Sequence, residues 1–111
     1  MARNVMDEIR DEVTHNEVVL YMKGTPSFPM CGFSATVVNL LQQHGRPFAH
    51  VNILEDQEKR EAIKTYSSWP TIPQLYVGGK FVGGSDIVQE LHQSGELEKL
   101  LKEAFQSSSA A

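Results

Sequence analysis

The feature that most constrains the fold is a buried strand that passes into a helix through a loop containing two prolines. The strand is the apolar run Val18–Met22, and the helix runs from about Gly32 to His44, with apolar residues at helical spacing and Gly45 as its C-terminal glycine. A second strand candidate, Ala49–Ile53, follows. Two strands joined through a helix form a parallel pair with a right-handed crossover. The sequence therefore predicts an α/β fold with Cys31 at the strand-to-helix junction.

Cys31 is the only cysteine of the chain, and its predicted surroundings favour a thiolate. The first N–H groups of a helix lack partners within it, and the helix dipole adds partial positive charge there. Lys23 adds a cation. Such surroundings lower a cysteine pKa from about 8.5 to about 3.5–7.5, which makes the sulfur a nucleophile and a metal ligand. The alternative is a small buried hydrophobe, but the flanking prolines and Gly32 favour an accessible thiol.

The remaining segments complete a mixed sheet. The third and fourth strands, Gln74–Val77 and Lys80–Val82, form a hairpin across Gly78-Gly79, whereas the first two strands are parallel. This is a mixed four-stranded sheet flanked by helices on both faces, the thioredoxin-like layout. The further predicted elements are a helix capped by Asn4 that ends near Asn16, a helix from Gln57 to about Ser67 capped by Asp56, strands Gln74–Val77 and Lys80–Val82, a helix opened by Gly83-Gly84-Ser85-Asp86 and ended by Gly95, and a last helix carrying Leu97, Leu100, Leu101 and Phe105.

Length and composition predict one domain over residues 1–111, with a core over about 17–105 and a frayed tail over 107–111. The net charge of −4 excludes the basic footprint of a nucleic-acid binder or a polybasic membrane patch. No apolar stretch reaches the roughly 20 residues of a membrane span. The early Asp7 and Glu8 fit neither a signal nor a transit peptide. We expect a cytoplasmic, reducing location, and one cysteine forms no internal disulfide.

Two further segments have features of a binding surface. Trp69-Pro70-Thr71-Ile72-Pro73 predicts a rigid bend, with Ile72-Pro73 the place to expect a cis bond, and its backbone could pair with an extended peptide. An ordinary proline turn with Trp69 in the core is the alternative. Gly83-Gly84 before a helix predicts N–H donors suited to a carboxylate, or else a plain turn capped by Ser85.

The charged and imidazole side chains elsewhere carry weaker signals. Lys59, Arg60 and Lys64 are predicted to face solvent, although Arg60 is equally a binding candidate. His44 lies thirteen residues beyond Cys31 on one helix, about 20 Å away, and so cannot be its base. The other histidines lack metal-ligand spacing and are expected at the surface or in turns: His15, His50 and His92.

Four motifs together resemble the monothiol glutaredoxins of the CGFS type. They match in order and spacing across roughly Glu17 to Phe105: Lys23-Gly24-Thr25-Pro26, Cys31-Gly32-Phe33-Ser34, Trp69-Pro70-Thr71-Ile72-Pro73-Gln74 and Gly83-Gly84-Ser85-Asp86. The resemblance implies a glutathione site on one rim of the fold. In it, Lys23 and Arg60 would pair with the glycine carboxylate, Ile72 would give backbone hydrogen bonds, and Ser85 with Asp86 would hold the γ-glutamyl end.

The resemblance also implies chemistry for Cys31. Ser34 stands where dithiol relatives have a second cysteine, so a mixed disulfide on Cys31 would wait for external glutathione. Some members carry a cysteine where this chain has Ser85, so a disulfide between that position and Cys31 is impossible here. A [2Fe–2S] cluster needs four thiolates, which two copies of Cys31 and two glutathiones would supply. The implied function is a cluster carrier that forms a homodimer around its cluster and works with BolA-like proteins and iron–sulfur acceptor proteins.

Two alternatives use the same residues differently. The first is reduction of glutathionylated proteins by the single thiol of Cys31. The second is an adaptor domain whose thiol is incidental. The loop residues Thr25 to Pro29 are associated in the family with weak reductase activity, and Met30 has no role that the sequence predicts.

Overall fold

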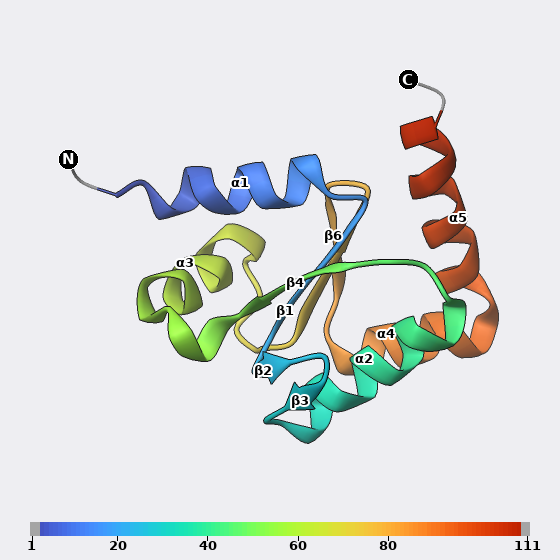
Figure 1. Cartoon of the computed structure of the whole chain (residues 1–111), viewed down its shortest axis with the longest axis horizontal. Helices are drawn as coiled ribbons and strands as arrows, with labels where there is room; N and C mark the ends of the chain where they lie inside the picture. The colour runs from blue at the N-terminus through green and yellow to red at the C-terminus, as the bar shows by residue number, and fades with distance from the viewer. Residues whose placement is uncertain (1–2, 110–111) are drawn as a thin grey trace.

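A four-stranded sheet in the order β4-β1-β5-β6 lies at the centre of the molecule (Figure 1). The structure is a computed structural model that describes residues 3–109. β1 (Val18–Met22) pairs in parallel with β4 (Ala49–Asn52) and antiparallel with β5 (Gln74–Val77), which pairs antiparallel with β6 (Lys80–Gly83). The predicted thioredoxin-like α/β fold with a mixed four-stranded sheet is confirmed.

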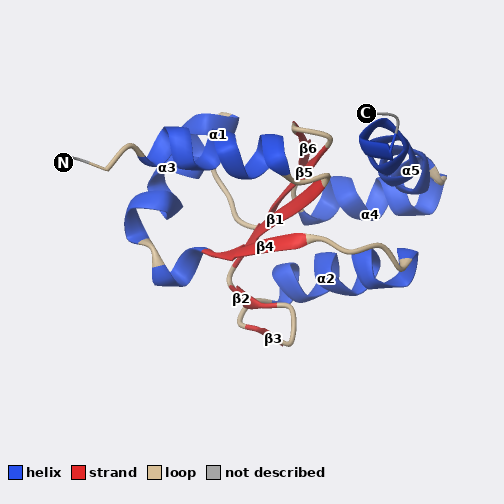
Figure 2. Ribbon diagram, turned by 45° about the horizontal axis from the view of Figure 1, so that its top comes forward, coloured by secondary structure: helices blue, strands red, loops and turns tan. Residues whose placement is uncertain are grey.

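Helices cover both faces of this sheet (Figure 2). One face is covered by α1 and α3, and the other by α2, α4 and α5. The bounds are α1 Val5–His15, α2 Gly32–His44, α3 Gln57–Ser67, α4 Ser85–Ser94 and α5 Glu96–Ser109, with a short 3₁₀ helix at Ile53–Glu55. No helix within residues 3–109 combines the length and apolar character that crossing a bilayer requires.

β1 is buried on both faces because it lies between the two helical layers. Val18, Leu20 and Met22 pack into the cluster formed with α2, α4 and α5, whereas Val19 and Tyr21 pack toward α1 and α3. Successive side chains of a strand point to opposite faces, so one strand contributes to both clusters. Full burial of each such apolar side chain contributes about 1.5–3 kcal/mol. The continuous apolar run in the sequence is therefore a strand with two core faces.

The predicted helix ends are confirmed at four positions. The side chain of Asn4 accepts the N–H of Asp7 at the start of α1, and Asp56 accepts that of Lys59 at the start of α3. Gly45 and Gly95 adopt left-handed backbone conformations at the ends of α2 and α4. These contacts satisfy helix-end groups that otherwise lack partners.

The loop between β1 and α2 is more regular than the sequence predicted. It forms a small hairpin of β2 (Gly24–Thr25) and β3 (Phe28–Pro29). Gly24 has φ +90°, and a Cβ at this position would lie 2.5 Å from the carbonyl oxygen of Phe28. Only glycine allows this close antiparallel approach. The Met30 N–H donates to the Lys23 carbonyl at 2.9 Å and closes the hairpin beside Cys31.

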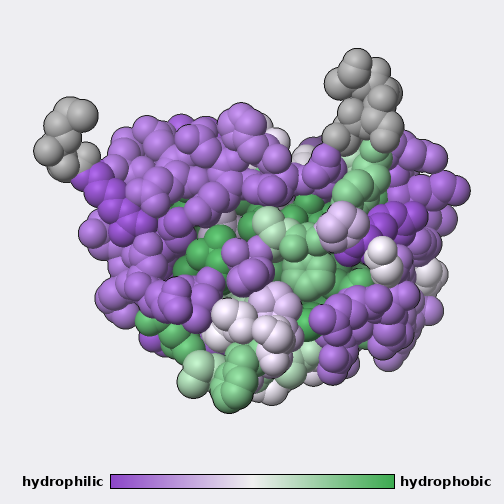
Figure 3. Space-filling model, in the orientation of Figure 1, coloured by the Kyte–Doolittle hydropathy of each residue, from purple (hydrophilic) through white to green (hydrophobic). Residues whose placement is uncertain are grey.

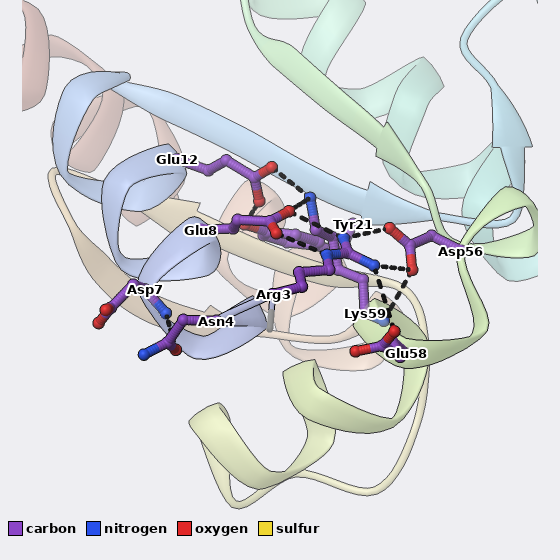
Figure 4. A network of polar contacts seen from close by, with 9 residues as sticks. All are labelled: Arg3, Asn4, Asp7, Glu8, Glu12, Tyr21, Asp56, Glu58 and Lys59. Carbon is purple, nitrogen blue, oxygen red and sulfur yellow. Dashed lines mark hydrogen bonds and ion pairs between the residues drawn. The ribbon is translucent and has the colours of Figure 1, made fainter. Parts of the chain in front are cut away.

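The prediction that Lys59 faces solvent is wrong. Its side chain is buried between α1 and α3, with its Nζ 2.6 Å from a Glu12 carboxylate oxygen and 3.4 Å from a Glu8 oxygen (Figure 4). Burial of a charge is tolerated when opposite charges and hydrogen bonds accompany it. The acidic residues of α1 supply both, a long-range pairing that the local pattern of α3 does not reveal.

Other local predictions differ in detail. β4 ends at Asn52, and Ile53 begins the 3₁₀ helix, because the Asn52 side chain accepts the Leu54 N–H. α5 is helical through Ser109, so it occupies the start of the segment predicted as a frayed tail, of which residues 110–111 lie outside the described residues. His92 is half-buried on α4, and its ring packs edge-on against that of His44, with 5.2 Å between the ring centroids. His44 lies at the opposite end of α2 from Cys31, as predicted.

Arg3 bridges α1 to the N-terminus of α3. Its guanidinium donates to the carboxylates of Glu8 and Asp56 at 2.5–3.0 Å (Figure 4). The hydrogen bonds from Arg3 lower the pKa of both carboxyl groups to about 2. Asp56 also caps α3, and its hydrogen bond to the Lys59 N–H acts in the same direction.

These ion pairs predict a specific acid dependence of stability. Because both carboxyl pKa values are lower in the folded chain, their stabilising contribution is complete above about pH 4.5 and is lost as the pH falls through about 2. We expect Arg3→Gln to melt below the wild type at neutral pH, and the two melting temperatures to converge toward pH 2. Thermal unfolding followed by circular dichroism measures both. Arg10→Gln, which removes an exposed arginine of α1, controls for net charge. A difference in melting temperature between Arg3→Gln and the wild type that stays constant with pH would contradict the role of these ion pairs.

Candidate functional site

All six residues that the sequence predicted as site residues line one cleft of about 440 Å³. The cleft lies where the N-terminus of α2, the side of α3, the bend before β5 and the N-terminus of α4 meet. These elements are far apart in sequence, and the parallel and antiparallel pairing of β1 brings them to one end of the sheet. The six residues are Lys23, Cys31, Arg60, Ile72, Ser85 and Asp86.

Cys31 is the N-cap residue of α2 and is partly exposed at the cleft. Partial burial on its own raises the pKa of the thiol. The backbone N–H groups of Ser34 and Phe33, at the start of α2, oppose this effect, and the Ser34 hydroxyl and the Lys23 charge add to them. The net result is a lowered pKa for the Cys31 thiol. An accessible sulfur with a lowered pKa can act as a nucleophile or a metal ligand.

Ser34 has a structural contact that sequence reasoning did not predict. Its side chain is completely buried, and its hydroxyl accepts the backbone N–H of Lys23 at 3.1 Å. This hydrogen bond ties the end of β1 to the first turn of α2 and so fixes the spacing between Lys23 and Cys31. A serine hydroxyl at this position supports the thiol without being able to form a disulfide with it.

The bend between α3 and β5 forms the opposite wall. The Ile72-Pro73 peptide bond is cis, as predicted. The buried side chain of Gln74 donates to the carbonyl oxygens of Trp69 and Thr71 at 3.0 and 3.2 Å. Within the described part of the chain, the backbone of Ile72 forms no hydrogen bond. The bend is therefore held from within and leaves peptide groups of Ile72 available to a ligand.

The third wall is the start of α4. Gly84 is its N-cap residue, and no side chain caps the helix. Ser85 lies inside the helix and its hydroxyl accepts from Gln89, so the alternative of a turn capped by Ser85 is wrong. Gly83 has φ +154°, and a Cβ there would lie 2.6 Å from the Cβ of Ile87. The helix start consequently presents backbone N–H donors to the cleft, where they favour an anion.

Three cations line the cleft. Lys23 and Arg60 both line it, and neither has an ion-pair partner among the side chains of residues 3–106. Lys64 lines it as well, although the sequence predicted that it faces solvent, and it pairs with Glu61 at 3.3 Å. Lys64 follows Arg60 by four residues, which places both on one side of α3. This spacing could have predicted that Lys64 lines the cleft.

Large apolar side chains close to Cys31 in the sequence are exposed on the outer surface. Phe28, Met30 and Phe33 are 72%, 62% and 63% exposed, and Figure 3 shows hydrophobic surface at the end of the molecule where β2 and β3 lie. Trp69 is 38% exposed and lines the cleft, with its ring 5.8 Å from that of Phe81, so it is not a core residue. Sequence reasoning gave Phe33 no role, although it follows Cys31 by two residues.

Comparison with known proteins identifies the family. Residues 18–82 match the glutaredoxin family. The "Probable monothiol glutaredoxin 2" of Rickettsia conorii is 55% identical over 94 residues, which cover 85% of this chain and 88% of that protein. This chain belongs to the monothiol glutaredoxins. A single cysteine with a serine three residues later, in the strand-to-helix position, agrees with that membership.

Two further relatives extend the comparison. "Monothiol glutaredoxin-S15, mitochondrial" of Arabidopsis thaliana is 48% identical over 100 residues, which cover 90% of this chain but only 59% of that protein. The solution structure of reduced poplar apo GrxS14 is 50% identical, with a TM-score of 0.80 over 89% of this glutaredoxin and 91% of that chain. One relative is mitochondrial by name and another is from a bacterium, so the cytoplasmic location of this glutaredoxin stays a prediction.

Acidic, histidine and cysteine side chains are common protein ligands of metal ions. Within the part of the chain that the structure describes, no group of three or more such residues could hold a metal ion.

The surroundings of Cys31 predict the effect of changing Ser34. Ser34→Ala removes the hydroxyl that stabilises the thiolate and frees the Lys23 N–H, so we expect the pKa of Cys31 to rise. Because Cys31 is the only thiol, ultraviolet thiolate absorbance against pH reports it directly, and the pH dependence of alkylation provides a second measurement. Ser27→Ala, at an exposed serine of the hairpin, is the matched control. Equal titration curves for wild type and Ser34→Ala would refute the assignment.

Proposed function

We propose that this monothiol glutaredoxin binds glutathione in the cleft and carries a [2Fe–2S] cluster between two copies of itself for transfer to other proteins. The observation that carries the proposal is the combination of one accessible thiol of lowered pKa with adjacent cations and open backbone donors in one cleft. Membership of the glutaredoxin family supports glutathione as the ligand.

The chemistry of the cleft walls fits the two charged ends of glutathione. Lys23 and Arg60 would bind the glycine carboxylate, because they are cations without ion-pair partners in the described side chains. Ile72 would hydrogen-bond the cysteinyl portion in the manner of a short added strand. At the far end, the N–H groups of Ser85 and Asp86 would receive the γ-glutamyl carboxylate, and the Asp86 carboxylate would face its ammonium group.

The cluster is cargo, and its ligand count explains the need for two copies. An iron–sulfur cluster of this type takes four cysteine thiolates, and this chain has one cysteine. Two copies of Cys31 and the thiolates of two bound glutathiones complete the set. Since half of the ligands would belong to a diffusible tripeptide, the cluster could leave without opening a protein cage made of four cysteines.

The partners follow from the same arrangement. A homodimer is expected only with the cluster bound, because the cluster would join the two copies of Cys31. BolA-like proteins and iron–sulfur acceptor proteins are the proposed further partners, through family membership. The exposed apolar side chains of Phe28, Met30 and Phe33, which are close to Cys31 in the sequence, are suited to such contacts.

A second function, reduction of glutathionylated proteins, is favoured by the lowered pKa of Cys31. The Cys31 thiolate would attack the glutathione sulfur and expel the protein thiolate, forming a mixed disulfide with glutathione. A second glutathione thiolate would then attack this mixed disulfide, releasing oxidised glutathione and regenerating Cys31. No second cysteine exists to perform that step within the chain, so turnover would depend on the concentration of glutathione.

Anaerobic reconstitution tests the carrier function. With iron, sulfide and glutathione, we expect the wild type to form a coloured dimer containing one [2Fe–2S] cluster. Omission of glutathione or the change Cys31→Ser is expected to leave a colourless monomer. Visible absorption and light scattering give cluster content and mass. A colourless monomer of the wild type under every condition would favour disulfide reduction, which turnover on a glutathionylated protein measures.

Glutathione binding by the apo protein tests the cleft separately. Arg60→Gln is expected to weaken binding about tenfold, because one charge-assisted hydrogen bond contributes about 1.5 kcal/mol. Arg10→Gln changes the net charge equally at an exposed position of α1 and is expected to bind like the wild type. Isothermal titration calorimetry measures both. Unchanged affinity in Arg60→Gln would remove this residue from the proposed site.

A further inference from the structure

Glu12 is connected to two walls of the cleft although it does not line it. It lies on α1, and its two carboxylate oxygens have different partners (Figure 4). Oε2 is 2.6 Å from Nζ of Lys59 on α3, and Oε1 accepts the hydroxyl of Tyr21 on β1 at 2.6 Å. Both partners are buried. One carboxylate thus joins α1, α3 and the sheet.

The first connection runs into α3. Lys59 directly precedes Arg60, the cation on the cleft side of the same helix, and lies five residues before Lys64. Lys59 is only 7% exposed, so loss of its ion pair with Glu12 would leave a buried charge with only the longer 3.4 Å contact to Glu8, which is unfavourable. The free energy that keeps Lys59 against α1 therefore also keeps the side of α3 that carries Arg60 and Lys64 turned toward the cleft.

The second connection runs through the sheet to the bend. The ring of Tyr21 packs edge-on against Tyr76 at 5.6 Å between centroids, and the Tyr76 hydroxyl donates to the Gln74 side-chain oxygen at 3.2 Å. The Gln74 amide nitrogen in turn donates to the carbonyl oxygens of Trp69 and Thr71. These side chains form a continuous buried path from Glu12 to the wall that contains Ile72.

We propose that Glu12 is a positioning residue that holds the cationic wall on α3 and the bend before β5 at the spacing that glutathione requires. The proposal rests on the proposed glutathione site and adds a determinant of its geometry outside the cleft. Glu12 also lies outside residues 18–82, the segment that matches the glutaredoxin family. In this chain, α1 accordingly contributes to binding in addition to covering the sheet.

Two substitutions separate the two connections. Glu12→Gln keeps an oxygen that can accept from Tyr21 but replaces the oxygen facing Lys59 with an amide donor. Tyr21→Phe keeps the aromatic ring and the Glu12–Lys59 ion pair but removes the hydrogen bond to the sheet. Asp11→Asn is the control, because it removes one negative charge from the exposed side of the same helix.

The test compares glutathione with its glycine monoethyl ester, in which the carboxylate proposed to contact Lys23 and Arg60 is masked. Calorimetric titration of the full apo chain measures both affinities. We expect Glu12→Gln to weaken the binding of glutathione about fivefold and to leave the affinity for the ester nearly unchanged, because displacement of α3 acts on the contact with the carboxylate. Tyr21→Phe is expected to lower the affinity for both ligands about twofold and to keep the ratio of the two affinities. Asp11→Asn is expected to behave like the wild type.

The outcomes distinguish the inference from the proposed function. A wild type that does not bind glutathione would overturn the proposed function and the inference with it. A wild type that prefers glutathione over the ester, together with a folded Glu12→Gln that keeps the same preference, would overturn the inference alone. Circular dichroism checks the fold of each variant. If Glu12→Gln does not fold, Tyr21→Phe decides, since unchanged affinity for both ligands in that variant would exclude the path through the sheet.

Discussion

Burial of β1 between two helical layers is the constraint on which the rest of the structure depends. Its residues alternate between the cluster with α2, α4 and α5 and the cluster with α1 and α3. A strand with two core faces cannot shift by one residue without exchanging the two sets of side chains. The register with β4 and β5 is therefore strongly determined. The register fixes the position of the end of β1, and thereby the positions of Lys23 and of the start of α2.

The cleft forms at that end because three unrelated chain segments stop there. α2 begins with Cys31, the bend before β5 is held by Gln74, and α4 begins after Gly84 without a side-chain cap. Each segment leaves polar backbone or side-chain groups at its end, and the core beneath them supplies the rigidity. Lowering of the Cys31 pKa is a result of the same geometry, since the first N–H groups of α2 and the Lys23 charge act on the sulfur together.

The sequence predicts the parts of this structure that local physics determines. The apolar run of β1, the caps at Asn4 and Asp56 and the hairpin at Gly78-Gly79 are all short-range patterns, and the structure confirms them. The prediction failed for Lys59, because its burial depends on Glu8 and Glu12, about fifty residues earlier in the chain. The β2–β3 hairpin was also missed, since its strands are two residues long and lack apolar alternation.

For the site, the residue types were predictable from the motifs, whereas their meeting in one place was implied only by the family resemblance. The structure places all six predicted residues in one cleft. The position of Lys64 in the cleft was not predicted, because it depends on the orientation of α3. That orientation is determined by the contacts of α3 with α1. A local pattern shows that a helix is amphipathic and does not show which of two polar sides meets a neighbouring loop.

The contacts behind α3 also determine which cations remain available in an acidic protein. Lys59, Arg60 and Lys64 are close in sequence, within a chain of net charge −4. Glu8 and Glu12 on α1 neutralise Lys59 from behind, and Glu61 pairs with Lys64 at a partly exposed position, where such a pair is weak. Arg60, between them in sequence, faces the cleft without an ion-pair partner in the described side chains. The acidic residues of α1 thus give α3 a neutral inner side and a cationic cleft side, and this separation of charge creates a local preference for anions despite the net negative charge of the chain.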